Sequence, residues 1–225
     1  MADPARLLAA LQHGDSQFPS GGFAFSWGLE GLMGGGHLGR RDLCRFIEGQ
    51  FRQRWASFDR VLIAQAHRRS RDLPGLCELD EWADAAILAE PAREGSKRAG
   101  NALLGVHQRL GTPGAAELRA RVHDGGAHGH QAVVQGLVLA GVGLGLEEAL
   151  AVAAHTGATA FCTAAIRLGL ASHLDAQQAL TALRPVLAEL LACPLPALDE
   201  AAAFTPAAEI AMMRHAGQEL RLFAT

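Results

Sequence analysis

The feature that most constrains this chain is apolar residues recurring at spacings of three and four along most of its length. The pattern is clearest after Asp42, where Arg45, Glu48 and Arg52 mark the polar face. Such spacing places apolar side chains on one face of an α-helix. No stretch shows the sustained alternation of a strand bounded by hairpin signals, so an all-α fold is predicted. The apolar positions of this segment are Leu43, Phe46, Ile47, Phe51 and Trp55.

The helical pattern continues through the chain and is broken only by short turn sequences. These are "GTPG" at 111–114, "HDGGAHGH" at 123–130, "GVGLG" at 141–145 and "CPLPALDE" at 193–200. None is long or polar enough for a domain linker. We therefore predict one domain, 1–225, folded as a single bundle of about nine to eleven helices. Helices are expected near 4–11, 42–55, 59–70, 79–90, 92–110, 115–122, 131–143, 147–172, 175–192 and 206–217.

Charge and hydropathy narrow the possible partners. The formal net charge is −3, with a sequence pI near 6.4. This balance gives no general attraction to phosphate backbones, so neither nucleic acid nor an anionic membrane is an expected partner. The longest apolar run, 132–146, is interrupted by Gln135 and glycines and is shorter than the roughly twenty residues of a membrane span. The opening "MADPARLL" lacks the pattern of an export signal, so a soluble cytoplasmic protein is expected.

The stretch "FPSGGFAFSWGLEG" at 18–31 raises the question of catalysis. Residues 24–28, with Ser26 at the centre, nearly match the G-x-S-x-G nucleophile elbow, which requires a buried strand ahead of the serine. The preceding "QFPSGG" does not form such a strand, yet a helical hydrolase using Ser26 remains the alternative. The sequence contains no G-x-x-x-x-G-K-[ST] loop, so any nucleotide chemistry is expected on a partner.

Histidines in the loop at 123–130 are the other candidates for chemistry. His123, His128 and His130 lie beside Asp124, and imidazoles suit nickel or zinc. A fixed site needs three or four ligands held by further contacts, which this glycine-rich loop does not supply. No stable metal site is predicted, and His128 and His130 are only weak candidates. A scaffold for another metallocentre therefore stays open.

An interaction protein is the remaining class. Phe18, Phe23, Phe25 and Trp27 are residue types enriched at interface hot spots, and the neighbouring glycines permit close backbone approach. The same aromatic side chains could equally fill the core beside the first helix. Physical reasoning alone leaves the two interpretations open.

Four segments resemble the family of urease accessory protein F (UreF). "LLAALQHGDSQFPSGGFAFSWGLE" is similar to the family's amino-terminal signature, and "GHQAVVQGLVLAGVGLGLEEAL" at 129–150 to its G-H-x-x-V-x-x-G helix. "CTAAIRLG" at 162–169 resembles its S-A-A-V-R-L segment, and "TPAAEIAMMRHAGQELRLF" its closing pattern. The chain departs from the family at Leu170 and at Ser172 and His173, where a proline and a Gly-Gln pair are common.

The resemblance implies a non-enzymatic, all-helical nickel-incorporation factor that forms a homodimer. It implies binding to accessory protein UreD (UreH in some organisms), recruitment of the GTPase UreG and docking on apo-urease. It also implies that the protein regulates the GTPase cycle. Ni²⁺ would be handled transiently by the complex, with no cofactor bound stably. The partner-binding residues it suggests are Phe23, Phe25, Ser26, Trp27, Glu30, Arg214, His215, Gln218, Arg221, Leu222 and Phe223. The structural positions it suggests are Pro19, Gly21, Gly22, Gly28, His130 and Arg167.

The end of the chain is predicted to be a partner-binding tail at about 206–225. Thr205 and Pro206 are typical of an N-cap and a first helical residue. Arg214, Gln218 and Arg221 would share one face if the last helix continued through them. Exposed arginines gain little from ion pairs within the chain, so we expect this segment to become ordered on a partner.

Overall fold

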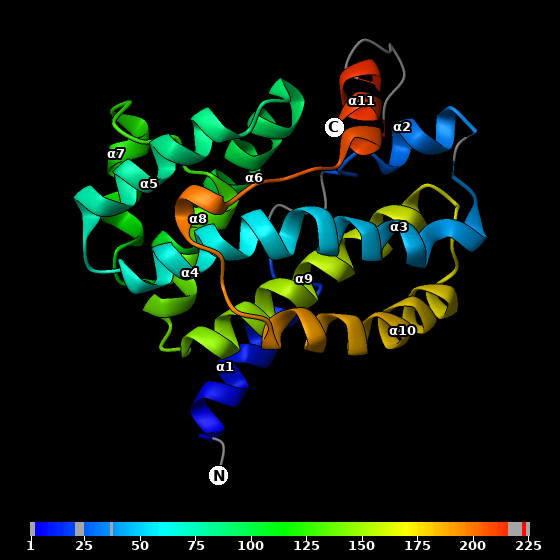
Figure 1. The fold of residues 1–225 in the computed structure, drawn as a ribbon. Helices are drawn as coiled ribbons and strands as arrows, with labels where there is room; N and C mark the ends of the chain where they lie inside the picture. The colour runs from blue at the N-terminus through cyan, green and yellow to red at the C-terminus, as the bar shows by residue number, and fades with distance from the viewer. Residues whose placement is uncertain (1–2, 21–24, 37, 216–221, 224–225) are drawn as a thin grey trace.

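The fold is known from a computed structural model, which describes residues 3–20, 25–36, 38–215 and 222–223. These residues form helices and no strand (Figure 1), which confirms the all-α prediction. The elements are α1 (Pro4–Gly14), α2 (Leu29–Gly34), η2 (Arg40–Asp42), α3 (Leu43–Gln50), η3 (Phe51–Asp59), α4 (Arg60–Arg68), α5 (Leu73–Ala86), α6 (Glu90–Arg109), α7 (Ala115–His123), α8 (Gln131–Gly141), α9 (Leu146–Arg167), α10 (His173–Ala192), η4 (Leu198–Glu200) and α11 (Pro206–His215).

Helix α9 connects two hydrophobic clusters. Its first half, with Leu150 and Val152, packs in a cluster built mainly from α4 to α8. Its second half, with Ala158 and Cys162, packs in a cluster built mainly from α3 and α10. Helices α4 and α8 approach closely because α8 carries Gly136, where a Cβ atom would lie 2.3 Å from the carbonyl oxygen of Ile63. That close contact sets the rotation of α8 about its axis, and so determines which of its residues face the candidate site.

Elements α3, η3 and α4 follow one another without interruption from residue 43 to 68. The sequence predicted separate helices at 42–55 and 59–70, but the structure joins them through a nine-residue π-helical segment, η3. Its apolar residues Phe51, Trp55 and Phe58 are buried. Because Phe51 and Trp55 continue the apolar spacing of α3, the sequence carries no signal for the change of helix type. π-Helical turns are uncommon and recur at functional sites.

Other departures from the predicted elements have local causes. Helix α2 was not predicted, because it lies within a glycine-rich stretch. Helix α5 begins at Leu73, six residues before the predicted start, since Asp72 accepts a hydrogen bond from the backbone N–H of Gly75 and Pro74 occupies the first turn. Helix α10 begins at His173 because Ser172 and Asp175 form a capping box, so the departure from the family pattern at Ser172 supplies a helix cap.

A buried arginine closes the far end of α10. Arg60 of α4 is 2% exposed and donates hydrogen bonds to the carbonyl oxygens of Leu190, Cys193 (3.1 Å) and Pro194 (3.0 Å). Burial lowers the pKa of Arg60, and the negative end of the α10 dipole opposes that cost. These bonds satisfy carbonyl groups that the helix itself leaves without donors.

Helix α9 is long and apolar enough to cross a membrane, with a mean hydropathy of 1.5, although the sequence pointed only to the shorter run at 132–146. In the fold, 56% of its apolar window is buried inside the protein. The small residues along α9 pack between the two clusters, and this placement is that of a core helix.

A stack of aromatic rings ties α1 to α6. The His13 ring lies 5.2 Å from that of His107 and 4.7 Å from that of Phe18, measured between centroids. His107 is fully buried, and its Nδ1 lies 2.9 Å from Oγ1 of Thr112. Burial, with a smaller contribution from His13, lowers the pKa of His107 from 6.5 to about 4.

We expect this histidine to make the fold sensitive to acid. The unfolded chain binds a proton at His107 near pH 6.5 and the folded chain only near pH 4, so stability is full above pH 6.5 and falls as the pH drops toward 4. The loss amounts to about 3 kcal/mol. Urea denaturation at pH 7 and pH 4.5 should show a smaller loss for His107→Phe than for the wild type. The exposed His173→Gln is the control, and an unchanged pH dependence in His107→Phe would contradict the assignment.

Candidate functional site

The described part of the signature motif forms a tight turn that starts α2. Phe25 and Ser26 are buried, at 4% and 0% exposure. Trp27 has φ +50°, an unusual value for a bulky residue, and Gly28 follows with φ +88°. The pair reverses the chain so that α2 begins at Leu29. Such strained conformations persist only where the surrounding structure holds them, and they cluster at functional sites.

Ser26 lies inside this turn. Its hydroxyl oxygen accepts a long hydrogen bond (3.4 Å) from the backbone N–H of Glu30, and its carbonyl accepts one from Leu29 (3.1 Å). No strand precedes it among the described residues, and its side chain is fully enclosed. The hydrolase alternative therefore fails on accessibility: Ser26 supports the start of α2.

Helix α2 packs directly on the helix at the other end of the chain, α11. A Cβ atom at Gly28 would lie 2.7 Å from the carbonyl oxygen of Ala208, and one at Gly31 would lie 2.7 Å from that of Ala211. Both distances are shorter than any ordinary contact, so the glycines allow the two backbones to meet. Figure 1 shows α2 and α11 side by side at one end of the molecule.

Glu30 joins the motif to the end of the chain. Its carboxylate oxygens accept hydrogen bonds from the backbone N–H groups of Leu222 (2.8 Å) and Phe223 (3.1 Å), and Nε2 of His215 lies 3.0 Å from the same group. Phe223 is 4% exposed, and the Arg167 guanidinium lies 4.3 Å from its ring centroid. We call Glu30, Arg167, His215 and Phe223 the terminal clasp.

The remaining predicted residues fall into three groups. Arg214 and Leu222 are exposed beside the terminal clasp, and Pro19 is exposed ahead of the motif. The tail was predicted to become ordered on a partner, but its described parts already lie against the body of the protein. Five predicted residues lie outside the described residues: Gly21, Gly22, Phe23, Gln218 and Arg221.

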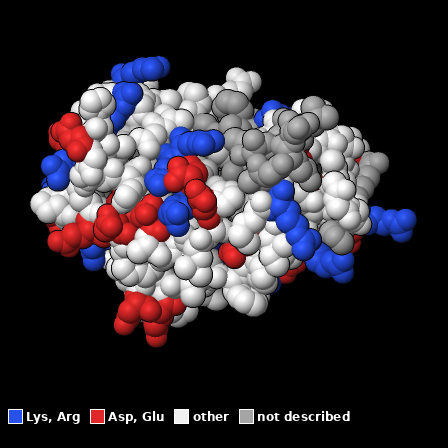
Figure 2. All heavy atoms as spheres, turned by 90° about the horizontal axis from the view of Figure 1, so that it is seen from above, with Lys and Arg blue, Asp and Glu red and all other residues white. Residues whose placement is uncertain are grey.

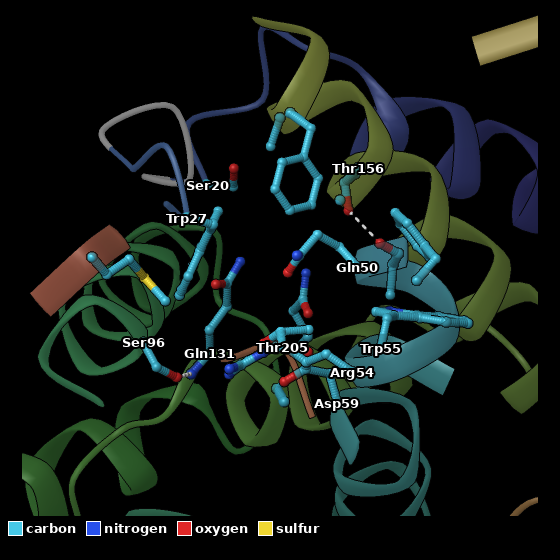
Figure 3. A pocket seen from close by; sticks show the side chains of 18 residues that line it. Ser20, Trp27, Gln50, Arg54, Trp55, Asp59, Ser96, Gln131, Thr156 and Thr205 are labelled. Carbon is cyan, nitrogen blue, oxygen red and sulfur yellow. Dashed lines mark hydrogen bonds and ion pairs between the residues drawn. The ribbon is translucent and has the colours of Figure 1, made fainter. Parts of the chain in front are cut away.

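A hollow of about 110 Å³ lies between the motif, η3, α8 and α9 (Figure 3). Trp27 forms one side, and the tail contributes Thr205 and Met212. In the close-up, Gln50 and Gln131 reach into the hollow from opposite walls. This site could not be predicted from the sequence, because its lining comes from segments far apart in the chain. The other lining residues are Ser20, Phe51, Arg54, Trp55, Asp59, Ser96, Ala132, Gln135, Ala153, Thr156, Gly157, Ala160 and Phe161.

His128 and His130, the weak metal-ligand candidates of the sequence, belong to a different polar cluster. Asp80, which is fully buried, accepts hydrogen bonds from the backbone N–H groups of His128, Gly129 (2.7 Å) and His130 (2.8 Å). Asp80 thereby fixes the loop that ends at His130, the N-cap residue of α8. Asp80 was not predicted as a functional residue, because nothing in the sequence around this carboxylate indicates that it binds a loop some fifty residues later.

Asp84 and Lys97 occupy the space next to these histidines. His130 Nε2 and Lys97 Nζ lie 3.2 and 3.3 Å from Oδ1 of Asp84. Burial opposes ionisation of Asp84, but the charge of His128 and hydrogen bonds from His130 and Lys97 hold its pKa below the usual value. Burial lowers the pKa of His130 despite the nearby carboxylates. Within the described ranges, no three His, Cys, Asp or Glu side chains are placed to hold a metal ion.

Charges of both signs occur on the face seen in Figure 2. Acidic side chains are more numerous over the end that carries α5 and α7, with basic side chains among them. Lys97 contacts Glu94 (2.6 Å) as well as Asp84, so its charge is locally balanced. This mixed pattern, like the net charge of −3, is unlike the continuous basic surface of a nucleic-acid-binding protein.

Comparisons with known proteins agree on one family. The family model UreF matches residues 39–184. The urease accessory protein UreF of Trichodesmium erythraeum is 31% identical over 235 residues, covering 99% of this chain and 98% of that protein. The UreF proteins of Actinobacillus pleuropneumoniae serotype 5b (31% identical, 96% of this chain and 98% of the relative) and Agrobacterium fabrum (33%, 97% and 96%) are similar over comparable lengths.

The contact between α2 and α11 can be tested with two glycines of α2. Gly31→Ala places a methyl group against the Ala211 carbonyl, whereas Gly34→Ala meets nothing within 4 Å. We expect Gly31→Ala to lower the free energy of unfolding by about 1–3 kcal/mol and Gly34→Ala to leave it unchanged or raise it by up to about 1 kcal/mol. Urea denaturation measures both, and equal effects of the two substitutions would show that the helices do not pack this closely.

Proposed function

Because this chain belongs to the UreF family of urease accessory proteins, we propose that it is a non-catalytic adaptor in urease maturation. In this proposal it bridges UreD (UreH in some organisms) and the GTPase UreG on apo-urease, and so regulates GTP-dependent nickel delivery. It acts in the cytoplasm as a homodimer. The similarity to curated UreF proteins over nearly the whole chain supports this placement.

The observation that best supports an adaptor is the exposed apolar surface of the tail. Phe204 (72% exposed), Ile210 (44%), Met213 (51%) and Leu222 (64%) lie on α11 or beside it. We call these four residues the tail surface. Ile210 and Met213 are three residues apart on α11 and so share one helix face, and exposed apolar side chains that gather on one face mark protein-binding surfaces. The terminal clasp holds α11 in a defined position without help from a partner.

Nickel enters this proposal as cargo that the complex passes on. A carrier that must release its ion needs weak, short-lived ligands, whereas a tight cage of the kind found in structural metal sites would retain it. The loop histidines His128 and His130 are engaged with Glu81 and Asp84. The coordination of Ni²⁺ is therefore assigned mainly to the partner proteins.

The tail surface is best tested by charge substitution. Removing 214–225 would also remove the buried His215 and Phe223, so a truncation confuses docking with folding. We expect the double variant Ile210→Glu, Met213→Glu to lower UreD capture in a pull-down at least about tenfold, because loss of a few buried apolar contacts at an interface exceeds 1.4 kcal/mol. Urease activation in a reconstituted assay should fall in parallel.

Leu174→Glu is the matched control, since Leu174 is 67% exposed on the outer helix α10. All these variants should keep the melting temperature of the wild type within a few degrees, because about half or more of each substituted side chain is exposed to solvent. Wild-type capture of UreD by the double variant would exclude the tail surface as the docking element and turn attention to the motif at 18–30.

A second test concerns the nucleotide. The sequence has no phosphate-binding loop, so the purified protein should neither bind nor hydrolyse GTP, whereas UreG should bind it alone and in the complex. Equilibrium binding of a fluorescent GTP analogue measures this. Micromolar binding by the isolated protein would contradict the division of labour proposed here.

A further inference from the structure

The hollow beside Trp27 is lined by amide groups that face one another. Gln50, at the end of α3, is only 9% exposed and reaches inward from one wall (Figure 3). Gln131 and Gln135 are four residues apart on α8, so both lie on the helix face that forms the other wall. Amides from two helices far apart in the sequence thus meet across one small space.

These three amides are not used by the protein itself. Among the described residues, none of the three side chains has a hydrogen-bond partner, although each offers two N–H donors and one carbonyl acceptor. Gln50 is buried and Gln131 and Gln135 are half-buried, so their amide groups are open to a molecule that enters the hollow. An occupant that both donates and accepts hydrogen bonds would match these amides.

The charge of the hollow favours a neutral occupant. Arg54 and Asp59 are its charged lining residues, and they pair with each other at 3.2 Å between Nε and Oδ2. The Arg54 guanidinium also lies 6.0 Å from the Trp27 ring centroid and 5.8 Å from that of Phe58. Since the arginine is already matched by a carboxylate and two rings, an anion gains little there.

The walls favour a flat molecule. Phe51 and Trp55 of η3 have ring centroids 5.4 Å apart, and Phe161 of α9 and Trp27 of the motif add further aromatic surface. The π-helical segment η3 carries two of these rings together with Arg54 and Asp59. A rare helix type and a strained turn at Trp27 therefore converge on the same space.

We propose that this hollow is a binding site for a small, planar, neutral molecule of the carboxamide or urea class. Its carbonyl and N–H groups would be held between Gln50 on one side and Gln131 and Gln135 on the other. The volume of about 110 Å³ admits several non-hydrogen atoms, since one water needs only about 10–15 Å³ of such space. The proposal goes beyond the adaptor role, which needs no small molecule.

An occupant would also touch the tail. Thr205 and Met212 line the same hollow as Trp27, and Met212 is buried at 2% exposure on α11. A molecule bound there would add contacts between the motif turn and α11. Binding should therefore raise the melting temperature of the protein, because a ligand that binds only the folded state stabilises that state.

Three probes of nearly the same shape separate the possible chemistries. Acetamide carries the proposed amide, acetate is its anionic counterpart, and acetone lacks N–H donors. Saturation-transfer NMR on the full chain should show acetamide binding in the millimolar range, as suits so small a ligand, with acetate and acetone at least about tenfold weaker. Added urea should reduce the saturation-transfer signal of acetamide, at urea concentrations well below those that unfold the protein.

The double variant Gln50→Met, Gln131→Met should weaken acetamide binding at least about tenfold, since methionine keeps the size and loses the amide. Gln178→Met on the exposed face of α10 is the matched control. Absence of acetamide binding, tighter binding of acetate, or unchanged binding in the double variant would each overturn the proposal. If the variant does not fold, the order of the three probes on the wild type still decides.

A failure of this site can be told apart from a failure of the adaptor role. The tail-surface variants test UreD capture without touching the amides, and the glutamine variants leave Ile210 and Met213 intact. Loss of acetamide binding in the glutamine variants, together with normal UreD capture by the same variants, would identify the hollow as a separate ligand site.

Discussion

The arrangement of the candidate site depends on one carboxylate, that of Glu30. Its two oxygens bind the backbone of Leu222 and Phe223 and lie next to His215, so that residues nearly the whole chain length apart are held together. Hydrogen bonds to a charged acceptor are stronger than neutral ones, and Glu30 also stands in the first turn of α2, where negative charge is favoured. Without this carboxylate the tail would lose the hydrogen bonds at Leu222 and Phe223, and Phe223 would no longer be held against Arg167.

A second carboxylate, Asp80, does comparable work deeper in the bundle. By binding three consecutive backbone N–H groups it fixes the loop before α8 and thereby the direction in which Gln131 and Gln135 point. Ser96 adds a contact to the backbone N–H of Gln131 at 3.2 Å. The α8 side of the hollow is thus positioned by polar contacts around the buried Asp80, whose removal would leave unpaired groups in a low-dielectric interior.

The sequence predicted the helical class and most helices because their apolar faces repeat along each segment, as in α3, α6 and α8. It did not reveal α2, since glycines mask helix propensity there, nor η3, since its apolar positions continue the pattern of α3. Glu30 was recognised as a motif residue through a family resemblance, but its bonds to Leu222 and Phe223 depend on tertiary packing. The hollow was equally inaccessible to prediction, because Gln50 and Gln131 meet only after the bundle folds.

Trp27 connects the two parts of the site. Its ring borders the hollow, and its strained backbone leads directly into Gly28 and the turn that places Glu30. A small movement of this ring therefore changes either the shape of the hollow or the start of α2, since the close contacts of Gly28 and Gly31 with α11 leave no room for independent adjustment. Packed interfaces of this kind shift between discrete arrangements rather than deform continuously. The tail surface and the amide-lined hollow are thus connected in the fold through a single turn of the chain.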